Sequence, residues 1–232
     1  MIDIHTHILP GVDDGARTME ESLTMLKEFA QHGVKAVFAT SHVAANRGYA
    51  NHYSELKTRY DDLVKLKNAA NIDIDLYLGS EIDERSNLID LIKQSPTMNN
   101  SSYVLIDFGM RRADIHEIVY ELKIQGYQTI IAHPERYTYI DVEDVKQFKR
   151  EGALIQVSVS HITKEGHKAA NKFAKQLLKE DLIDFVATDA HRMNNNKDQM
   201  KRAYAIVTKK KGEAYANAIF HDNAKRLLID HE

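Results

Sequence analysis

The chain opens with Met1-Ile2-Asp3-Ile4-His5-Thr6-His7-Ile8, in which apolar isoleucines alternate with polar residues. This two-residue period predicts a β-strand. His5 and His7 are two positions apart, so both imidazoles leave the same face of that strand. Two imidazoles side by side can bind a divalent transition metal ion, but a lone His-x-His is as easily a pair of surface histidines. The number of later strands that end in similar side chains decides between these two interpretations.

The composition limits the class of protein. The chain has 232 residues, a formal net charge of -3 and no cysteine. The absence of cysteine excludes disulfides, thiolate metal ligands and a cysteine nucleophile. Because basic residues are not in excess, nucleic acid is not expected to be the main partner.

No targeting or membrane segment is expected. The first predicted strand begins at residue 2, which leaves no room for the basic start and apolar core of a signal peptide. No apolar run approaches the roughly 20 residues that a membrane-spanning helix needs. We therefore expect a cytoplasmic protein without membrane insertion, in which residues 1–232 form one domain.

Strand and helix patterns alternate along the whole chain. Strands are predicted at residues 1–8, 34–40, 72–78, 103–106, 129–132, 153–159 and 183–188. Helices are predicted at residues 18–33, 53–70, 88–93, 114–125, 142–151 and 168–180, and from about residue 197 onward. Seven strand–helix units without a linker favour a parallel sheet with crossover helices, closed into an α/β barrel.

Six of the seven predicted strands end in metal-binding side chains. In chain order these are His5 and His7, His42, Glu81, Asp107, His133, and finally Asp189 with His191. The sixth strand carries Ser158 and Ser160 instead. The carboxyl ends of the strands form one face of an α/β barrel, and that face is where the chemistry of such barrels takes place. Chance does not plausibly place such groups on six strands, so the sequence predicts one shared site.

The set is too large for a single ion. With Asp14 from the loop at residues 10–15, it reaches nine candidate ligands. At three or four protein ligands each, two or three divalent ions would fit. Imidazole and carboxylate ligands without sulfur suit Mn²⁺, Fe²⁺ or Zn²⁺, with Co²⁺ a further possibility, and do not choose among them.

The charge of the predicted site suggests a phosphate substrate. Three divalent ions would outweigh the four carboxylates of the set, and Arg136 follows His133 by three residues. A guanidinium can hold two phosphate oxygens in a fork. Metal-assisted hydrolysis of a phosphate monoester is therefore the predicted reaction. The alternative for Arg136 is a surface ion pair with Glu135 or with an acid on a helix.

These motifs resemble those of the PHP (polymerase and histidinol phosphatase) superfamily. Within it, they are most similar to the manganese-dependent bacterial tyrosine-protein phosphatases of the CpsB/YwqE type. The resemblance covers essentially the whole chain and rests on residues 3–15, 39–42, 79–81, 132–136 and 188–191. It implies a PHP-type distorted (β/α)7 TIM-like barrel that holds three metal ions, with manganese favoured.

The resemblance also implies roles for individual residues. One ion would be held by His5, His7, Glu81 and Asp189, a second by Glu81, Asp107 and His133, and a third by Asp14, His42 and His191. A metal-bridging hydroxide would attack phosphorus while Arg136 positions the phosphate, which makes Arg136, His133 and Asp189 the implied catalytic residues. The implied substrates are phosphotyrosines in the tails of bacterial tyrosine autokinases that control capsule and exopolysaccharide assembly.

The sequence departs from the family pattern at two places. The family usually has Glu where this chain has Asp107, which is one methylene shorter. The family also tends to carry a second phosphate-binding arginine after its Asp-x-His, and here only Arg192 or Lys197 could fill that role. We expect weaker substrate binding but the same reaction.

Other functions remain open at this point. A histidinol phosphatase or another small-molecule phosphatase would use the same fold. A hydrolase of the amidohydrolase type also starts with His-x-His, but it would need a strand-end lysine where Glu81 stands. A metal-binding regulatory module that docks on a kinase without turnover is the alternative from another class. The oligomeric state is not indicated.

Overall fold

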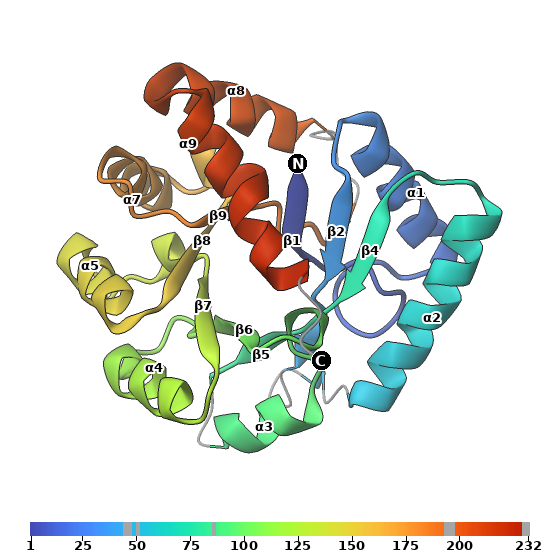
Figure 1. Cartoon of the computed structure of the whole chain (residues 1–232), viewed down its shortest axis with the longest axis horizontal. Coiled ribbons are helices and arrows are strands. Elements are labelled where there is room, and N and C mark those ends of the chain that lie inside the picture. The colour runs from blue at the N-terminus through green and yellow to red at the C-terminus, as the bar shows by residue number, and fades with distance from the viewer. Residues whose placement is uncertain (44–47, 50–51, 85–86, 193–197, 229–232) are drawn as a thin grey trace.

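A computed structural model describes residues 1–43, 48–49, 52–84, 87–192 and 198–228 of the chain. The strands in these residues are β1 (Ile2–Thr6), β2 (Ala36–Ala39), β3 (His42–Val43), β4 (Asp75–Leu78), β5 (Glu81–Asp83), β6 (Tyr103–Asp107), β7 (Gln128–Ala132), β8 (Leu154–Ser158) and β9 (Phe185–Ala187). Their neighbouring pairs are all parallel. Figure 1 shows the strands at the centre of the molecule with helices around them. The predicted α/β barrel is therefore confirmed.

Most of the helices surround the barrel strands, and the helical segment near the C-terminus lies across one end of the barrel (Figure 1). They are α1 (Met19–Gln31), α2 (Tyr53–Ala69), α3 (Leu88–Gln94), α4 (Ile115–Ile124), α5 (Val142–Glu151), α6 (Val159–Ile162), α7 (Lys168–Lys179), α8 (Gln199–Lys211) and α9 (Glu213–Asn217). Shorter turns of 3-10 or π helix cover Met98–Asn100, Pro134–Arg136, Ala218–Asp222 and Asn223–Leu228. Thr18 caps α1, because its side chain accepts the backbone N–H of Glu21.

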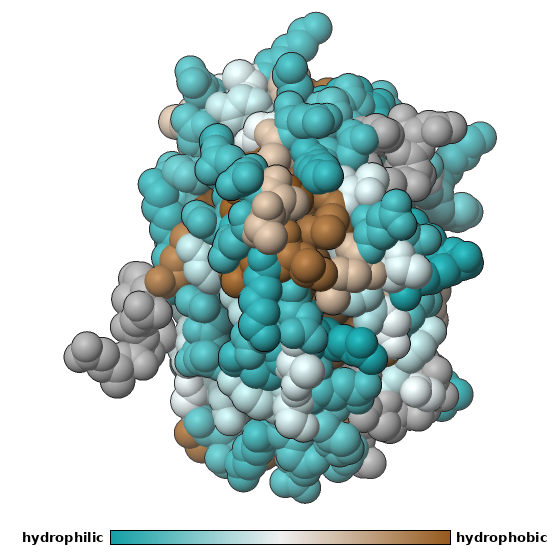
Figure 2. Space-filling view, turned by 90° about the vertical axis from the view of Figure 1, so that its right-hand side faces the viewer, coloured by the Kyte–Doolittle hydropathy of each residue, from teal (hydrophilic) through white to brown (hydrophobic). Residues whose placement is uncertain are grey.

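One face of the outer surface is mainly polar. This face, seen in Figure 2, is largely hydrophilic, and its largest hydrophobic area lies in the upper half. Among the helices that the structure describes, none combines the length and the apolar character needed to cross a lipid bilayer.

The strands form two sheets. One sheet has the order β1-β2-β4, and the other has the order β3-β5-β6-β7-β8-β9. After β2 the chain breaks at Thr40, whose N–H donates to the carbonyl of Thr6 at 2.8 Å, and it resumes as β3. After β4 it breaks at Gly79, where a Cβ would lie 2.9 Å from the sulfur of Met98, and it resumes as β5. The predicted strands at residues 34–40 and 72–78 therefore correspond to β2 and β4, and the separate short strands β3 and β5 were not predicted.

The barrel closes between its first and last strands. The backbone N–H of Asp189 donates to the carbonyl of His5 at 2.9 Å, and the N–H of His7 donates to the carbonyl of Ala190 at 2.9 Å. A side-chain link supports this seam, since the Thr188 hydroxyl donates to Asp3 Oδ2 at 2.6 Å. The closure brings the two ends of the sequence-predicted site, near residues 5 and 189, into direct contact.

A bulge in β1 allows this strand to contribute side chains both to the hydrophobic core and to the site. The β1–β2 register shifts between Asp3 and Thr6, so β1 has one more residue than β2 over this stretch. Ile2 and Ile4 pack in the apolar cluster inside the barrel, which includes Phe38, Leu105, Ile130 and Phe185 and is closed by Ala224 and Leu227 of the C-terminal segment. The site occupies the opposite, carboxyl end of the strands.

Candidate metal centre

The predicted metal ligands meet at the carboxyl ends of the barrel strands. In the described part of the chain, three groups have ligand atoms within 4.8 Å of one another: His7, Asp14, His42 and His191; His5, His7 and Glu81; and Glu81, Asp107 and His133. His7 and Glu81 each belong to two groups, so the groups form one continuous site. The ninth predicted ligand, Asp189, joins through Oδ1, which lies 3.2 Å from Nε2 of His7 and 3.4 Å from Nε2 of His5.

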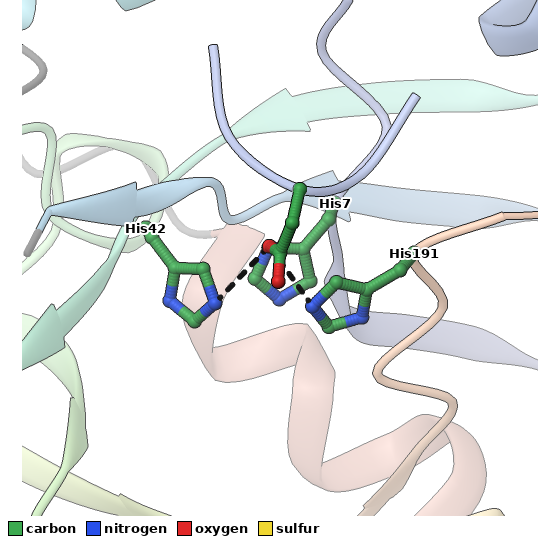
Figure 3. Close-up of side chains that lie close together, drawn as sticks. His7, His42 and His191 are labelled. Atoms are coloured by element: carbon green, nitrogen blue, oxygen red, sulfur yellow. Dashed lines mark ion pairs between the residues drawn. The ribbon is translucent and has the colours of Figure 1, made fainter. Parts of the chain in front are cut away.

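Figure 3 shows the first group, in which imidazoles from three separate parts of the chain surround a carboxylate. Oδ1 of Asp14 lies 3.6 Å from Nε2 of His42 and 3.4 Å from Nε2 of His191. The rings of His7 and His191 stack with their centroids 3.9 Å apart. The side chain of Asp14 is 50% exposed, so this group is the part of the site most open to solvent.

Glu81 lies between the imidazoles at the centre of the site. Its Oε2 is 2.8 Å from Nδ1 of His42, and its Oε1 is 2.8 Å from Nε2 of His133. Burial alone would raise the pKa of Glu81, but the neighbouring imidazoles, with His5 foremost, hold that pKa well below its usual value. Burial likewise opposes a charge on His7, but hydrogen bonds to Asp13 and Asp189 raise the pKa of His7 well above its usual value. The carboxylates and imidazoles thus stabilise each other's charged forms.

The Nδ1 atoms of His5 and His7 are each hydrogen-bonded to a neighbouring side chain. Nδ1 of His5 donates to the amide oxygen of Gln156 at 3.0 Å, and Nδ1 of His7 donates to Asp13 at 3.0 Å. With both Nδ1 atoms engaged, the two Nε2 atoms face each other at 3.3 Å. This orientation by outer partners is what metal-ligating histidines require. Nitrogen and oxygen donors that converge in this way fit a divalent ion.

Sequence reasoning missed both of these supporting residues. The side chain of Asp13 is buried and accepts the N–H of Gly15 and of His42 in addition to the His7 proton. Its neighbour Asp14 instead points toward His42 and His191. Gln156 lies on β8, the strand that was predicted to contribute only serines, and it also accepts the N–H of His133 at 3.3 Å. For Gln156, the signal available in the sequence was a polar residue within an otherwise apolar strand.

Two of the candidate ligands have left-handed backbone conformations. His133 has φ 34° and ψ 52°, and Asp189 has φ 53°. A residue with a Cβ pays roughly 1–3 kcal/mol for such a conformation, so it persists where the surrounding structure enforces it. These two backbones turn sharply just past β7 and β9, and the turns carry both side chains into the site.

Arg136 lies at the edge of the site and contacts one of its carboxylates. Its Nη2 is 2.6 Å from Oδ2 of Asp189 and 3.4 Å from the hydroxyl of Ser158, and its side chain is 36% exposed. The alternative partner considered above, Glu135, is instead buried and accepts the backbone N–H of Ser158 at 2.8 Å. Arg136 therefore faces the candidate ligands and remains accessible to a ligand from solvent.

The shorter acid at the end of β6 still reaches the site. Asp107 is buried and belongs to the group with Glu81 and His133. Its Oδ1 accepts the backbone N–H of Gly109 at 2.8 Å and lies 3.2 Å from the hydroxyl of Tyr137. These contacts fix the carboxylate beside the other two side chains, although it is one methylene shorter than Glu.

Arg192 and Lys197 are the two candidates for a second phosphate-binding residue. Arg192 donates to the backbone carbonyls of Asp14, at 3.3 Å, and Gly15, at 3.5 Å, so it lies over the first loop. Lys197 lies outside the described residues.

Two adjoining cavities open at this end of the barrel. One, of about 230 Å³, is lined by Glu81, Asp107 and His133 among others. The other, of about 600 Å³, includes Arg192 and Ser160. Both are lined by Asp14, Arg136, Asp189 and His191. The candidate ligands therefore border a space that a small substrate can enter.

Comparison with known proteins identifies the family to which this chain belongs. The model of the family described as "Capsular polysaccharide synthesis, CpsB/CapC" matches residues 1–229. The chain belongs to the CpsB/CapC family. It is 32% identical over 243 residues to the tyrosine-protein phosphatase CpsB of Streptococcus agalactiae, covering 100% of this chain and 99% of that protein. It is 30% identical over 235 residues to the tyrosine-protein phosphatase YwqE of Bacillus subtilis, covering 98% and 91%.

A solved structure of a related phosphatase has the same fold. The chain superimposes with a TM-score of 0.86 and 29% identity, over 93% of its length and 90% of the other chain, on a structure from work on YwqE of Bacillus subtilis and CpsB of Streptococcus pneumoniae, described as unique metal-dependent tyrosine phosphatases. A histidinol phosphate phosphatase from Lactococcus lactis has a TM-score of 0.55 at 12% identity, over 90% and 94% of the two chains, and shares the fold alone. The family and fold expected from the motifs are confirmed.

Proposed function

We propose that this chain is a metal-dependent tyrosine-protein phosphatase. The observation that carries the proposal is the convergence of nine nitrogen and oxygen donors beside the accessible guanidinium of Arg136. The names of its relatives, CpsB and YwqE, support the same activity. Phosphotyrosine in a protein, such as the tail of a bacterial tyrosine autokinase, is the proposed substrate. A cytoplasmic location and a single domain over residues 1–232 belong to the same proposal.

The nine ligands would be shared among three divalent ions. His5, His7, Glu81 and Asp189 would hold the first, Glu81, Asp107 and His133 the second, and Asp14, His42 and His191 the third. Hard carboxylate oxygens with borderline imidazoles suit Mn²⁺, which is our proposed metal. When bound, such ions supply Lewis acidity, which polarises phosphoryl oxygens and lowers the pKa of water.

The protein's own groups would bind and orient the phosphate. Arg136 can donate two parallel N–H bonds to phosphate oxygens, and its present partner, Asp189, would be neutralised in part by a cation. His133 and Asp189 hold fixed positions at the ends of β7 and β9, so the donors around the phosphate need little reorganisation. Arg192 and Lys197 are secondary candidates for phosphate contacts.

Metal removal and replacement tests the proposed function. Metal-stripped protein is expected to hydrolyse p-nitrophenyl phosphate and a phosphotyrosine peptide at background rate, and Mn²⁺ is expected to restore both activities. Phosphotyrosine peptide should be preferred to histidinol phosphate. If the protein binds Mn²⁺, Co²⁺ and Zn²⁺ but hydrolyses neither substrate, the non-catalytic regulatory module becomes the better description. Preference for histidinol phosphate would instead favour a small-molecule phosphatase.

Gln156→Leu is expected to weaken Mn²⁺ binding by about 10- to 100-fold. The substitution keeps the volume of the buried side chain but removes the acceptor that orients His5 and the backbone of His133. Isothermal titration of metal-stripped protein measures the effect, and circular dichroism checks that the fold is kept. Gln147→Leu, on the outer helix α5, is the matched control and should bind Mn²⁺ as the wild type does. Equal affinities for both variants would rule out the supporting role of Gln156.

A further inference from the structure

The turn between β6 and α4, formed by Gly109, Met110, Arg111 and Arg112, stands at the mouth of the candidate metal centre. Gly109 and Met110 line the same cavity as His133 and Arg136. The backbone N–H of Gly109 donates to Asp107 at 2.8 Å, which ties the turn to one of the candidate ligands. The turn therefore has a fixed position relative to any phosphate in the cavity.

Met110 presents an exposed apolar side chain at the edge of this cavity. Its side chain is 64% exposed, and it is the one strongly exposed large hydrophobic residue that lines this cavity in the described part of the chain. Methionine adapts its shape and makes favourable contacts with aromatic rings. An aryl phosphate in the cavity would thus have an apolar contact on the side of the turn, and the flanking residues of a peptide would continue over it.

Arg111 and Arg112, the next two residues of the turn, add positive charge beside this cavity. Arg111 and Arg112 are exposed, and no hydrogen bond or ion pair holds either side chain among the residues that the structure describes. Arg112 also lines a neighbouring cavity of about 410 Å³ at the start of α4 and α5. The acids of that cavity, Asp114 and Asp144, accept backbone N–H groups at the starts of these helices.

We propose that Arg111 and Arg112 bind an anionic group on a residue that flanks the phosphotyrosine of the substrate. This inference rests on the proposed phosphatase function and adds a preference among its peptide substrates. Carboxylate side chains and a second phosphate share the required chemistry, and guanidinium groups bind both. The turn thus acts in substrate recognition, next to but outside the candidate metal centre.

The size of the effect follows from the exposure of the two arginines. A single solvent-exposed ion pair changes affinity by up to about fivefold, so two arginines would together give roughly a tenfold preference for an anionic flank. A phosphate, with more charge and more acceptor oxygens, would give a larger preference than a carboxylate. Because exposed charges are screened by salt, the preference should shrink as ionic strength rises.

Three peptides with a central phosphotyrosine test the proposal with the Mn²⁺-loaded full chain. The flanking residues are alanines, glutamates, or alanines with a second phosphotyrosine. Wild type is expected to show about tenfold higher kcat/KM for the anionic peptides than for the alanine peptide, and less in 0.5 M KCl. In Arg111→Gln/Arg112→Gln this ratio should fall toward one. Lys209→Gln/Lys210→Gln, which removes two charges at the far end of α8, should keep the wild-type ratio.

The outcomes separate the failure of this inference from that of the proposed function. A wild type that hydrolyses all three peptides equally well, or a double-arginine variant that keeps the preference, would overturn the role of the turn. A preference for the doubly phosphorylated peptide alone would identify a second phosphate as the ligand. If no peptide is hydrolysed, the phosphatase proposal fails. Fluorescence anisotropy of labelled peptides then still shows whether the anionic preference depends on the two arginines.

Discussion

His133→Ala is expected to lower kcat/KM for aryl phosphates by about a thousandfold or more. The side chain lies 2.8 Å from Glu81 and belongs to the same group as Asp107, so its loss would open one complete ion site. A metal ion contributes several kcal/mol of transition-state stabilisation, which corresponds to a factor of this size. Steady-state kinetics with p-nitrophenyl phosphate and added Mn²⁺ measure the loss, and titration of Mn²⁺ should show fewer bound ions.

A histidine outside the site provides the control for this experiment. His116 on α4 contacts Glu151 at 2.9 Å, on the outer surface of the barrel. His116→Ala should keep both Mn²⁺ stoichiometry and kcat/KM. If His133→Ala retained most of the wild-type activity, the assignment of an ion to Glu81, Asp107 and His133 would be wrong.

Arg136→Ala is expected to lower kcat/KM by about 100- to 1,000-fold while Mn²⁺ binding persists. This is the usual cost of removing one positioned donor from a group that develops charge in the transition state. Arg136→Lys should restore part of the activity, because an ammonium supplies charge but not the two-pronged geometry of the guanidinium. Kinetics and Mn²⁺ titration on the same preparations separate the loss of phosphate binding from the loss of metal.

One result of the Arg136 experiment would change the role assigned to this arginine. Arg136 pairs with Asp189 at 2.6 Å, so truncating it also leaves a buried carboxylate with one partner fewer. Should Arg136→Ala lose Mn²⁺ and activity together, the arginine supports the metal centre and another group must bind the phosphate. Arg150→Ala, on the exposed end of α5, is the control for loss of an arginine elsewhere and should behave as the wild type.

Much of the fold followed from local sequence patterns. Each observed strand except β3 and β5 overlaps a predicted strand, because buried parallel strands are short apolar runs between helices with strong amphipathic patterns. The sequence predicted no strand at β3 or β5, because the predicted strands ended at residues 40 and 78. Where the chain passes from β2 to β3 and from β4 to β5, Thr40 contacts Thr6 and Gly79 lies close to Met98, and both partners are distant in the chain.

The sequence by itself determined which chemical groups would meet. Strand ends share one face of a parallel barrel, so the positions of His42 and Asp189 after apolar runs were sufficient to predict their neighbourhood. The family motifs then indicated the reaction. Neither source indicated the roles of Asp13 and Gln156, because a hydrogen bond to the far nitrogen of a histidine leaves no periodic signal.

Only the tertiary structure decided how those groups point. In an unbulged strand Ile4 and His5 would face opposite sides, and the extra residue in β1 allows Ile4 to pack in the barrel while His5 reaches the site. The left-handed backbones of His133 and Asp189 likewise depend on the closed barrel around them. Such conformations cost energy locally and are stabilised by contacts between distant residues, so the local sequence cannot specify them.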